Sequence, residues 1–184
     1  MSRRPWAVVT AVCLMGCGGA VDTEASTPLV QTEQPLLTLV SCLIGSVSSN
    51  YSPPLTTTPQ NVNITGTAVY SNCLGGGVTS ASNSTNALAT DYSCLGLLEI
   101  GTAPSVLTWN TGETSTLVQT RVAVQGAGLS VTVTHFGSVS SGKFAGATTV
   151  RVTEFLNTDL DACYTSGGLA RLSGPSTLTV LGLL

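Results

Sequence analysis

Hydrophobic and polar residues alternate with a period of two along several short stretches of this chain. The stretch LSVTVTHFG (129–137) places apolar residues at the odd positions from Leu129 to Val133 and hydroxyl residues at the even positions beside them. This alternation is typical of a half-buried β-strand. The stretch that follows, SVSSGKFAGATTVRVTEF, continues the pattern, with Val150 and Val152 on one face and Arg151 on the other.

Turn signals separate these stretches. PSVLTWN and ETSTLVQTRVAVQ flank the turn Asn110–Glu113, in which Gly112 supplies a positive φ, and a second turn is expected over 125–128. GPSTLTVLGL reads as the last strand, and no stretch has the helical period of 3.6. The pattern predicts an all-β domain, an antiparallel sandwich or barrel of about seven to nine strands. A solenoid is disfavoured because no internal repeat is visible.

The composition fits an exported β domain. Only 8% of the residues are charged, while the chain holds 28 Thr and 21 Ser, residues that suit a pleated, solvated surface. The formal net charge is −3, so the chain lacks the basic surface that nucleic acid requires, and no nucleic-acid partner is expected.

The N-terminus has the organisation of a secretory signal. Arg3 and Arg4 precede an apolar run from Trp6 to Met15, which is too short to span a membrane and is followed by small residues. The four residues LMGC that end this run resemble the lipobox of bacterial lipoproteins. That resemblance implies cleavage before Cys17, a lipid on the Cys17 thiol and stable membrane anchoring by the acyl chains. Cleavage just beyond, near Ala20, would instead release a secreted protein.

These signals divide the chain into three parts. Residues 1–16 are expected to be a signal peptide, residues 17–35 a lipidated cysteine with a flexible tether, and residues 36–184 the β domain. The tether would span about 60 Å when fully extended. Gly18 replaces the aspartate that retains such lipoproteins in the inner membrane, so we expect the outer membrane or cell surface, and otherwise secretion.

Processing removes Cys13 and lipidates Cys17, which leaves four cysteines for disulfides: Cys42, Cys73, Cys94 and Cys163. Four cysteines allow three connectivities. Two strands on either side of the loop SPPLTTTPQ are expected to form a hairpin whose midpoint lies near residues 56 and 57, and this places Cys42 opposite residue 71 or 72, almost on Cys73. The favoured pairing is therefore Cys42–Cys73 with Cys94–Cys163. The wide spacing disfavours zinc, and no metal or cofactor is expected.

Several short motifs resemble those of small secreted β proteins of actinobacteria and myxobacteria. They are NYSPPLTTTPQNV, TWNTGETST, SGKFAGATTV, NTDLDAC and the closing GPSTLTV. The resemblance covers most of residues 42–180. It implies export and a β fold, and it contributes no catalytic residue.

Catalytic chemistry finds little support in the sequence. His135 is the single histidine, no G-x-S-x-G motif marks a nucleophile, and His135 is expected at a strand end on the polar face. The acids show no pairing pattern: Glu99, Glu113, Glu154, Asp159 and Asp161. NTDLDA begins like a calcium loop but lacks the glycine and the final acid of an EF-hand. Trp109 is expected in the core, and no catalytic residue is assigned.

The sequence therefore predicts a cell-envelope lipoprotein that displays a disulfide-linked β domain. Its expected role is binding or structural, with a polysaccharide or another envelope protein as partner and the membrane contacted through the lipid on Cys17. Loops such as Ser52–Gln60 and Leu156–Gly168 are expected to carry specificity. A secreted enzyme or enzyme inhibitor is the alternative. Acids or a serine converging on His135 would favour the enzyme, whereas an exposed aromatic patch or a long edge strand would favour binding.

Overall fold

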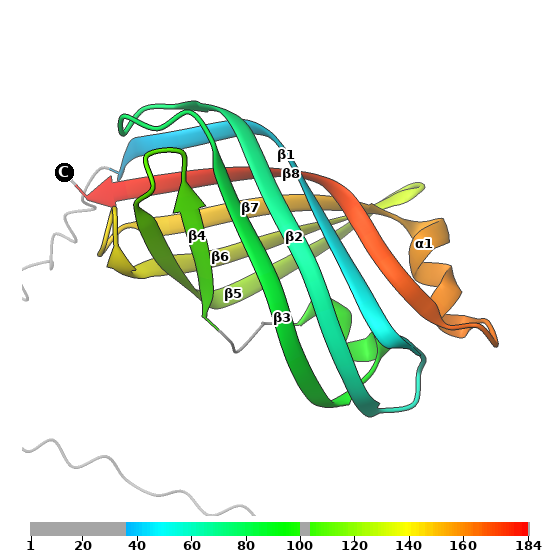
Figure 1. The fold of residues 1–184 in the computed structure, drawn as a ribbon. Helices are drawn as coiled ribbons and strands as arrows, with labels where there is room; N and C mark the ends of the chain where they lie inside the picture. Colours follow the sequence, from blue (N-terminus) through cyan, green and yellow to red (C-terminus); the bar gives the residue numbers. More distant parts are fainter. Residues whose placement is uncertain (1–35, 100–103, 184) are drawn as a thin grey trace, which may run out of the picture. The chain divides into compact units, whose positions relative to one another are not determined.

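A computed structural model describes residues 36–99 and 104–183, and these form an eight-stranded antiparallel barrel (Figure 1). Each strand pairs with the next along the chain, and the last strand pairs with the first. The all-β prediction is confirmed, and of the two predicted architectures the molecule has the barrel. Cys17 and the predicted signal peptide and tether lie outside the described residues. The strands are β1 (Leu36–Leu55), β2 (Gln60–Leu74), β3 (Ala81–Tyr92), β4 (Ser105–Trp109), β5 (Thr114–Ala127), β6 (Ser130–Gly142), β7 (Thr148–Leu156) and β8 (Leu169–Leu183).

The predicted β1–β2 hairpin is present, with its register one to two residues from the predicted one. Cys42 lies directly opposite Cys73, and the two form a disulfide. The pairing continues to Ser52 and Asn63, close to the loop. A second disulfide joins Cys94 to Cys163, so the predicted connectivity is confirmed for both bonds.

The connections of an up-and-down barrel gather at two ends. At one end, which we call the termini end, Leu36 pairs with Leu183 beside the turns that join β2 to β3, β4 to β5 and β6 to β7. The opposite end, the loop end, holds the other connections. There the 3-10 helices η1 (Cys94–Leu98) and η2 (Ala162–Tyr164) are held together by the Cys94–Cys163 bond.

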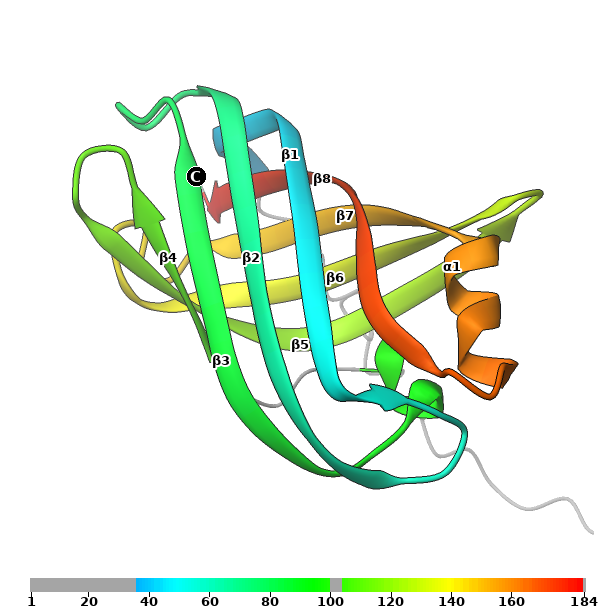
Figure 2. The same cartoon turned by 45° about the vertical axis from the view of Figure 1, so that its right-hand side comes forward.

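The sequence pattern missed a helix at the loop end. Asn157–Asp161 form the short helix α1, and η2 follows directly (Figure 2). The segment was expected to be a polar loop without helix. Its few residues do not complete two helical turns, so no 3.6-residue period could develop in the sequence.

The barrel interior contains two apolar clusters. The cluster at the termini end includes Trp109, the Cys42–Cys73 disulfide and Leu178. The cluster at the loop end includes Leu55, Val133 and Cys163. Each cluster buries inward-pointing residues of several strands, which is how a small barrel fills its interior.

Strand β7 turns its hydroxyl face inward. Thr149 is 5% exposed and Thr153 is 2% exposed, whereas Val150 and Val152 on the other face are only half-buried. The predicted alternation of the two faces is therefore present. The rule that the apolar face points to the core holds at Phe155, which belongs to the loop-end cluster, but not from Thr149 to Thr153, where the inward residues of β7 are polar.

Strand β3 was not among the strands that the sequence singled out. Its residues from Ser84 to Leu88 are all exposed, so neither face is buried there and no apolar alternation marks the strand. Period-two patterns arise only where one face is covered. This exposure follows from the strand's unusual pairing, described below.

Candidate functional site

A group of polar residues crosses the barrel interior between the two apolar clusters. We call it the polar belt, and it comprises His135 on β6, three residues of β7 and one residue of β8: Thr149, Arg151, Thr153 and Ser176. The register places His135 opposite Arg151 and Thr153 opposite Ser176. The two hydroxyls lie 2.9 Å apart, and Ser176 also donates to the carbonyl of Val152 at 3.0 Å.

The sequence predicted that His135 lies at a strand end on the polar face, and this prediction is wrong. His135 is in the middle of β6 and shares the inward face with Val133 and Val139, which are 1% and 2% exposed. The strand continues to Gly142, because the stretch after His135 keeps pairing with both β5 and β7. The mixed hydroxyl and apolar residues after His135 gave no sequence signal that the strand continues.

Two nitrogens of the polar belt are buried without a hydrogen-bond partner. They are Nδ1 of His135 and Nε of Arg151. Burial lowers the pKa of His135 from 6.5 to about 4, and the positive charge of Arg151 adds to this effect. His135 is therefore a neutral imidazole at pH 7.

Arg151 points into the barrel, and its guanidinium has no counter-ion among the described residues. No carboxylate of residues 36–99 or 104–183 lies within 4.0 Å of its guanidinium; the ion pair found there joins Lys143 to Glu113. Arg121, on β5, instead stacks over the Phe136 ring at 4.0 Å. Arg151 is thus placed very differently from a solvated surface arginine.

A cavity of about 30 Å³ adjoins these groups. Arg151, His135 and Thr149 line it together with Ser105 and Gln119, and Leu117 and Leu178 supply apolar walls. A Cβ at Gly137 would lie 2.4 Å from the Val118 carbonyl oxygen and 3.1 Å from the Thr149 hydroxyl. Glycine at this position therefore allows β5 and β6 to approach closely beside the cavity.

The wall of the barrel between β3 and β4 is paired over a short length. Only Ala81 and Ser82 of β3 pair with β4, opposite Trp109 and Thr108. Strand β3 continues to Tyr92, past the end of β4, and there it pairs with β2 alone among the described residues (Figure 2). The chain therefore has a strand edge of about ten residues whose backbone groups face no described strand.

Asn83 ends the ladder between these strands. Its side-chain amide donates to the Val106 carbonyl at 2.7 Å, in place of a backbone donor, and its Oδ1 accepts from the Thr85 hydroxyl at 3.3 Å. Short amide side chains compete with backbone pairing in this way. At Asn83, a side-chain hydrogen bond to β4 thus replaces the backbone pairing between β3 and β4.

The candidate acids are spread over the barrel. Glu113 pairs with Lys143 at 2.8 Å, Glu154 accepts from the Ser130 hydroxyl at 2.6 Å, and Asp159 and Asp161 lie in α1. None of the acids lines the cavity beside His135. A His–acid–Ser arrangement is therefore not assembled around His135 by the described residues.

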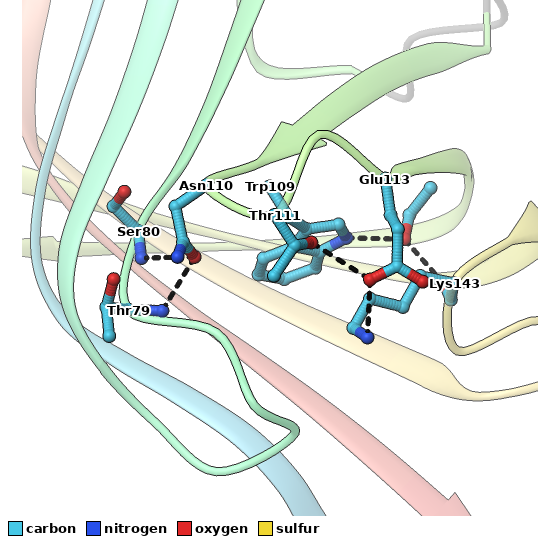
Figure 3. Close-up of polar contacts among 8 residues, drawn as sticks. Thr79, Ser80, Trp109, Asn110, Thr111, Glu113 and Lys143 are labelled. Atoms are coloured by element: carbon cyan, nitrogen blue, oxygen red, sulfur yellow. Dashed lines mark hydrogen bonds and ion pairs between the residues drawn. The ribbon is translucent and has the colours of Figure 1, made fainter.

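Trp109 lies in the core, as the sequence predicted, at 2% exposure. Its Nε1 donates to the Ser115 hydroxyl at 2.8 Å, and Ser115 donates to the Lys143 carbonyl (Figure 3). Its ring meets the Phe144 ring edge-on, with centroids 5.3 Å apart. The motifs TWNTGETST and SGKFAGATTV, far apart in the sequence, are thus in contact at the termini end, and their role there is structural.

Asn110 extends this contact to a third turn. Its Oδ1 accepts from the backbone N–H of Thr79 at 2.8 Å and of Ser80 at 3.3 Å (Figure 3). The three turns of the termini end are therefore joined by side chains of the β4–β5 turn and its neighbours.

Comparison with known proteins gives no relative for this chain. No family model, no curated protein and no solved structure matches it. Within the part of the chain that the structure describes, no helix is long and apolar enough to cross a membrane, and no three His, Cys, Asp or Glu side chains are grouped to hold a metal ion.

Proposed function

We propose that this chain is a cell-envelope lipoprotein whose barrel binds an extended segment of another envelope protein along the edge of β3. The lipid on Cys17 would anchor the chain and residues 18–35 would tether the barrel. The observation that carries the binding role is the edge of β3 from Asn83 to Tyr92, which has no strand partner among the described residues.

Such an edge is a ready template for strand addition. Unpaired N–H and C=O groups pair with an extended peptide, and proteins usually protect such edges with charges, prolines or short strands. The edge of β3 has none of these over SNSTNALAT, and its first charged residue is Asp91. Apart from Leu88, which is 71% exposed, its exposed residues up to Thr90 are small, so a partner backbone can approach with few large side chains in the way.

A polysaccharide is the less favoured partner. Sugar-binding surfaces present exposed aromatic rings, and most aromatic residues of this barrel are buried or half-buried. Tyr164 in η2, at 74% exposure, is the one exposed aromatic side chain of the described residues. A single ring does not form a flat aromatic patch, whereas the β3 edge is long and continuous.

The barrel also supports binding over catalysis. The enzyme alternative needs an acid or a nucleophile within hydrogen-bond reach of His135. Its charged neighbour in the barrel is instead Arg151, and that arginine favours the unprotonated imidazole. A neutral histidine beside an arginine has neither an orienting acid nor an activated serine.

Photocrosslinking in cells tests the strand-addition proposal. A photoreactive amino acid replaces Ser84, Asn86 or Leu88, which share the outer face of β3, and in the control it replaces Val69, an exposed residue of β2 that is paired on both sides. We expect crosslinks from β3 to one partner protein, at partner residues that advance by two as the probe position advances by two. Crosslinks to polysaccharide, or none from β3, would contradict the proposal.

Metabolic labelling tests the lipid anchor separately. Palmitate should label the full-length chain and be lost in Cys17→Ala, while Cys13→Ala should retain the label. A mature protein that begins after Ala20 and carries no lipid would rule out the anchor, and it would leave the barrel's binding role to be decided by the crosslinks.

A further inference from the structure

The polar belt contains a positive charge that the described residues do not balance, and this is independent of the β3 edge. Arg151 points into the barrel and is half-buried; its Nε is buried without a partner, and no described carboxylate lies within 4.0 Å of the guanidinium. Partial removal of a charge from water without a counter-ion is unfavourable, and a bound anion would reduce that cost.

The neighbours of Arg151 do not supply that negative charge. From β6 it faces His135, which burial and Arg151 keep neutral. From β8 it faces Leu178, and around the cavity β4 and β5 contribute Ser105, Leu117 and Gln119. Among residues 36–99 and 104–183, no titratable side chain other than His135 and Arg151 lines the cavity.

The cavity has the size and the lining for a small ion. About 10–15 Å³ of such space is needed to hold one water molecule, so a cavity of about 30 Å³ accepts a small ion or a terminal group. The guanidinium and the Thr149 hydroxyl both border it. A water molecule could satisfy the Arg151 Nε but would not balance its charge.

We propose that this cavity is a binding site for a small monovalent anion, held by the Arg151 guanidinium inside the barrel. The chemistry fits a halide or a carboxylate group, since both accept hydrogen bonds and carry one negative charge. A free ion and the carboxylate of a larger molecule present the same chemistry here. Comparing a short with a longer carboxylate distinguishes a free ion from the carboxylate of a larger molecule.

His135 provides a direct reporter because it is the only histidine of the chain. Without a bound anion, the charge of Arg151 lowers the pKa of His135. A bound anion would offset that charge, so anion binding should raise the pKa of His135. We expect the NMR titration midpoint of His135 to rise by about one pH unit in sodium chloride relative to sodium sulfate of equal ionic strength. Sulfate serves as reference because it is a larger, doubly charged anion than the monovalent ions proposed to bind.

Two arginine variants complete the test. In Arg151→Met the His135 midpoint should rise without salt and should no longer respond to chloride. Arg171→Met, which removes an exposed arginine of β8, should behave as the parent protein does. If the midpoint in the parent protein is the same in chloride and in sulfate, the proposal is overturned, whether or not Arg151→Met folds.

Thermal unfolding at pH 7 identifies the source of the anion. Chloride, formate and butyrate are compared in the parent protein and in Arg171→Met. An anion at about a hundred times its dissociation constant should raise the unfolding midpoint by about 5–10 °C. A rise with chloride and formate but not butyrate supports a free ion, and a larger rise with butyrate supports the carboxylate of a larger molecule. No saturable rise with any of the three would contradict the site.

Discussion

The termini-end cluster and the polar belt are neighbouring parts of one barrel interior, and they differ in whether their buried polar atoms are hydrogen-bonded. In the cluster, Trp109 donates to Ser115, and Ser115 donates onward to a backbone carbonyl. In the belt, Nδ1 of His135 and Nε of Arg151 have no partner. Native proteins satisfy nearly all buried polar groups, and the unsatisfied pair is the observation on which the anion site proposed above rests.

On the proposal of an anion site, the cluster residues hold the fold and the belt residues bind the ligand. Substitutions in the cluster should reduce stability strongly and leave anion binding intact. Substitutions in the belt should change titration and binding with smaller effects on stability. Three experiments of decreasing effect size examine this division.

Trp109→Ala should have the largest effect. The ring is almost fully buried and packs edge-on against Phe144, so its removal leaves a large cavity. We expect a loss of about 3–5 kcal/mol in the free energy of unfolding, measured by chemical denaturation. Val106→Ala is the control on the same strand, because Val106 is 50% exposed and should cost less than about 1 kcal/mol. Equal losses at the two positions would refute the structural role of Trp109.

The pH dependence of stability probes the belt. The folded-state pKa of His135 is about 4, below its ordinary 6.5, so between these values the unfolded chain binds the proton and the folded chain does not. Stability should therefore fall as the pH drops from 6.5 to 4 and should not change further through this group below pH 4. Because His135 is only partly buried, solvent screening reduces the expected contribution to about 1–2 kcal/mol.

His135→Gln isolates that contribution. The difference in unfolding free energy between this variant and the parent protein should slope with pH between 4 and 6.5 and be flat above 7. A difference that does not depend on pH would show that His135 titrates normally and that the belt is solvated. Measurement in sulfate avoids the chloride that the proposed site would bind.

The sequence predicted the parts of this molecule that depend on local pattern. The hairpin midpoint placed Cys42 within two residues of its observed partner Cys73, and the turn around Gly112 separated β4 from β5 where expected. Turn chemistry and strand alternation act between residues that are close in sequence, so they can be read from it. These local features predicted an all-β domain with two disulfides, but they did not decide between a sandwich and the observed barrel.

The candidate site could not be predicted in the same way. Alternation along β7 shows two faces, but the inward face carries Arg151 and Thr153 while the valines face outward. The choice depends on the neighbours that β6 and β8 present, and these lie far away in sequence. Local rules fail most often at functional sites, where a polar interior serves a ligand.

The edge of β3 depends on a mismatch of strand lengths. Strand β4 ends after five residues while β3 has twelve, and the sequence of β3 contains no signal of the missing partner. An exposed strand of Ser, Thr and Asn reads like a loop because nothing covers it. It forms a strand because its backbone pairs with β2.

Glu113→Gln should have the smallest effect and completes the comparison. Hydrogen bonds from Lys143 and Thr111 hold the pKa of Glu113 below its ordinary value, so the carboxylate stays charged to lower pH. The group is exposed, and exposed ion pairs contribute little because solvent and salt screen them. We expect the unfolding midpoint to change by no more than about 1 °C at low salt and not at all at 1 M salt. A change as large as that of Trp109→Ala would mean that the Lys143–Glu113 pair, and not the buried Trp109–Phe144 contact, joins the two turns of the termini end.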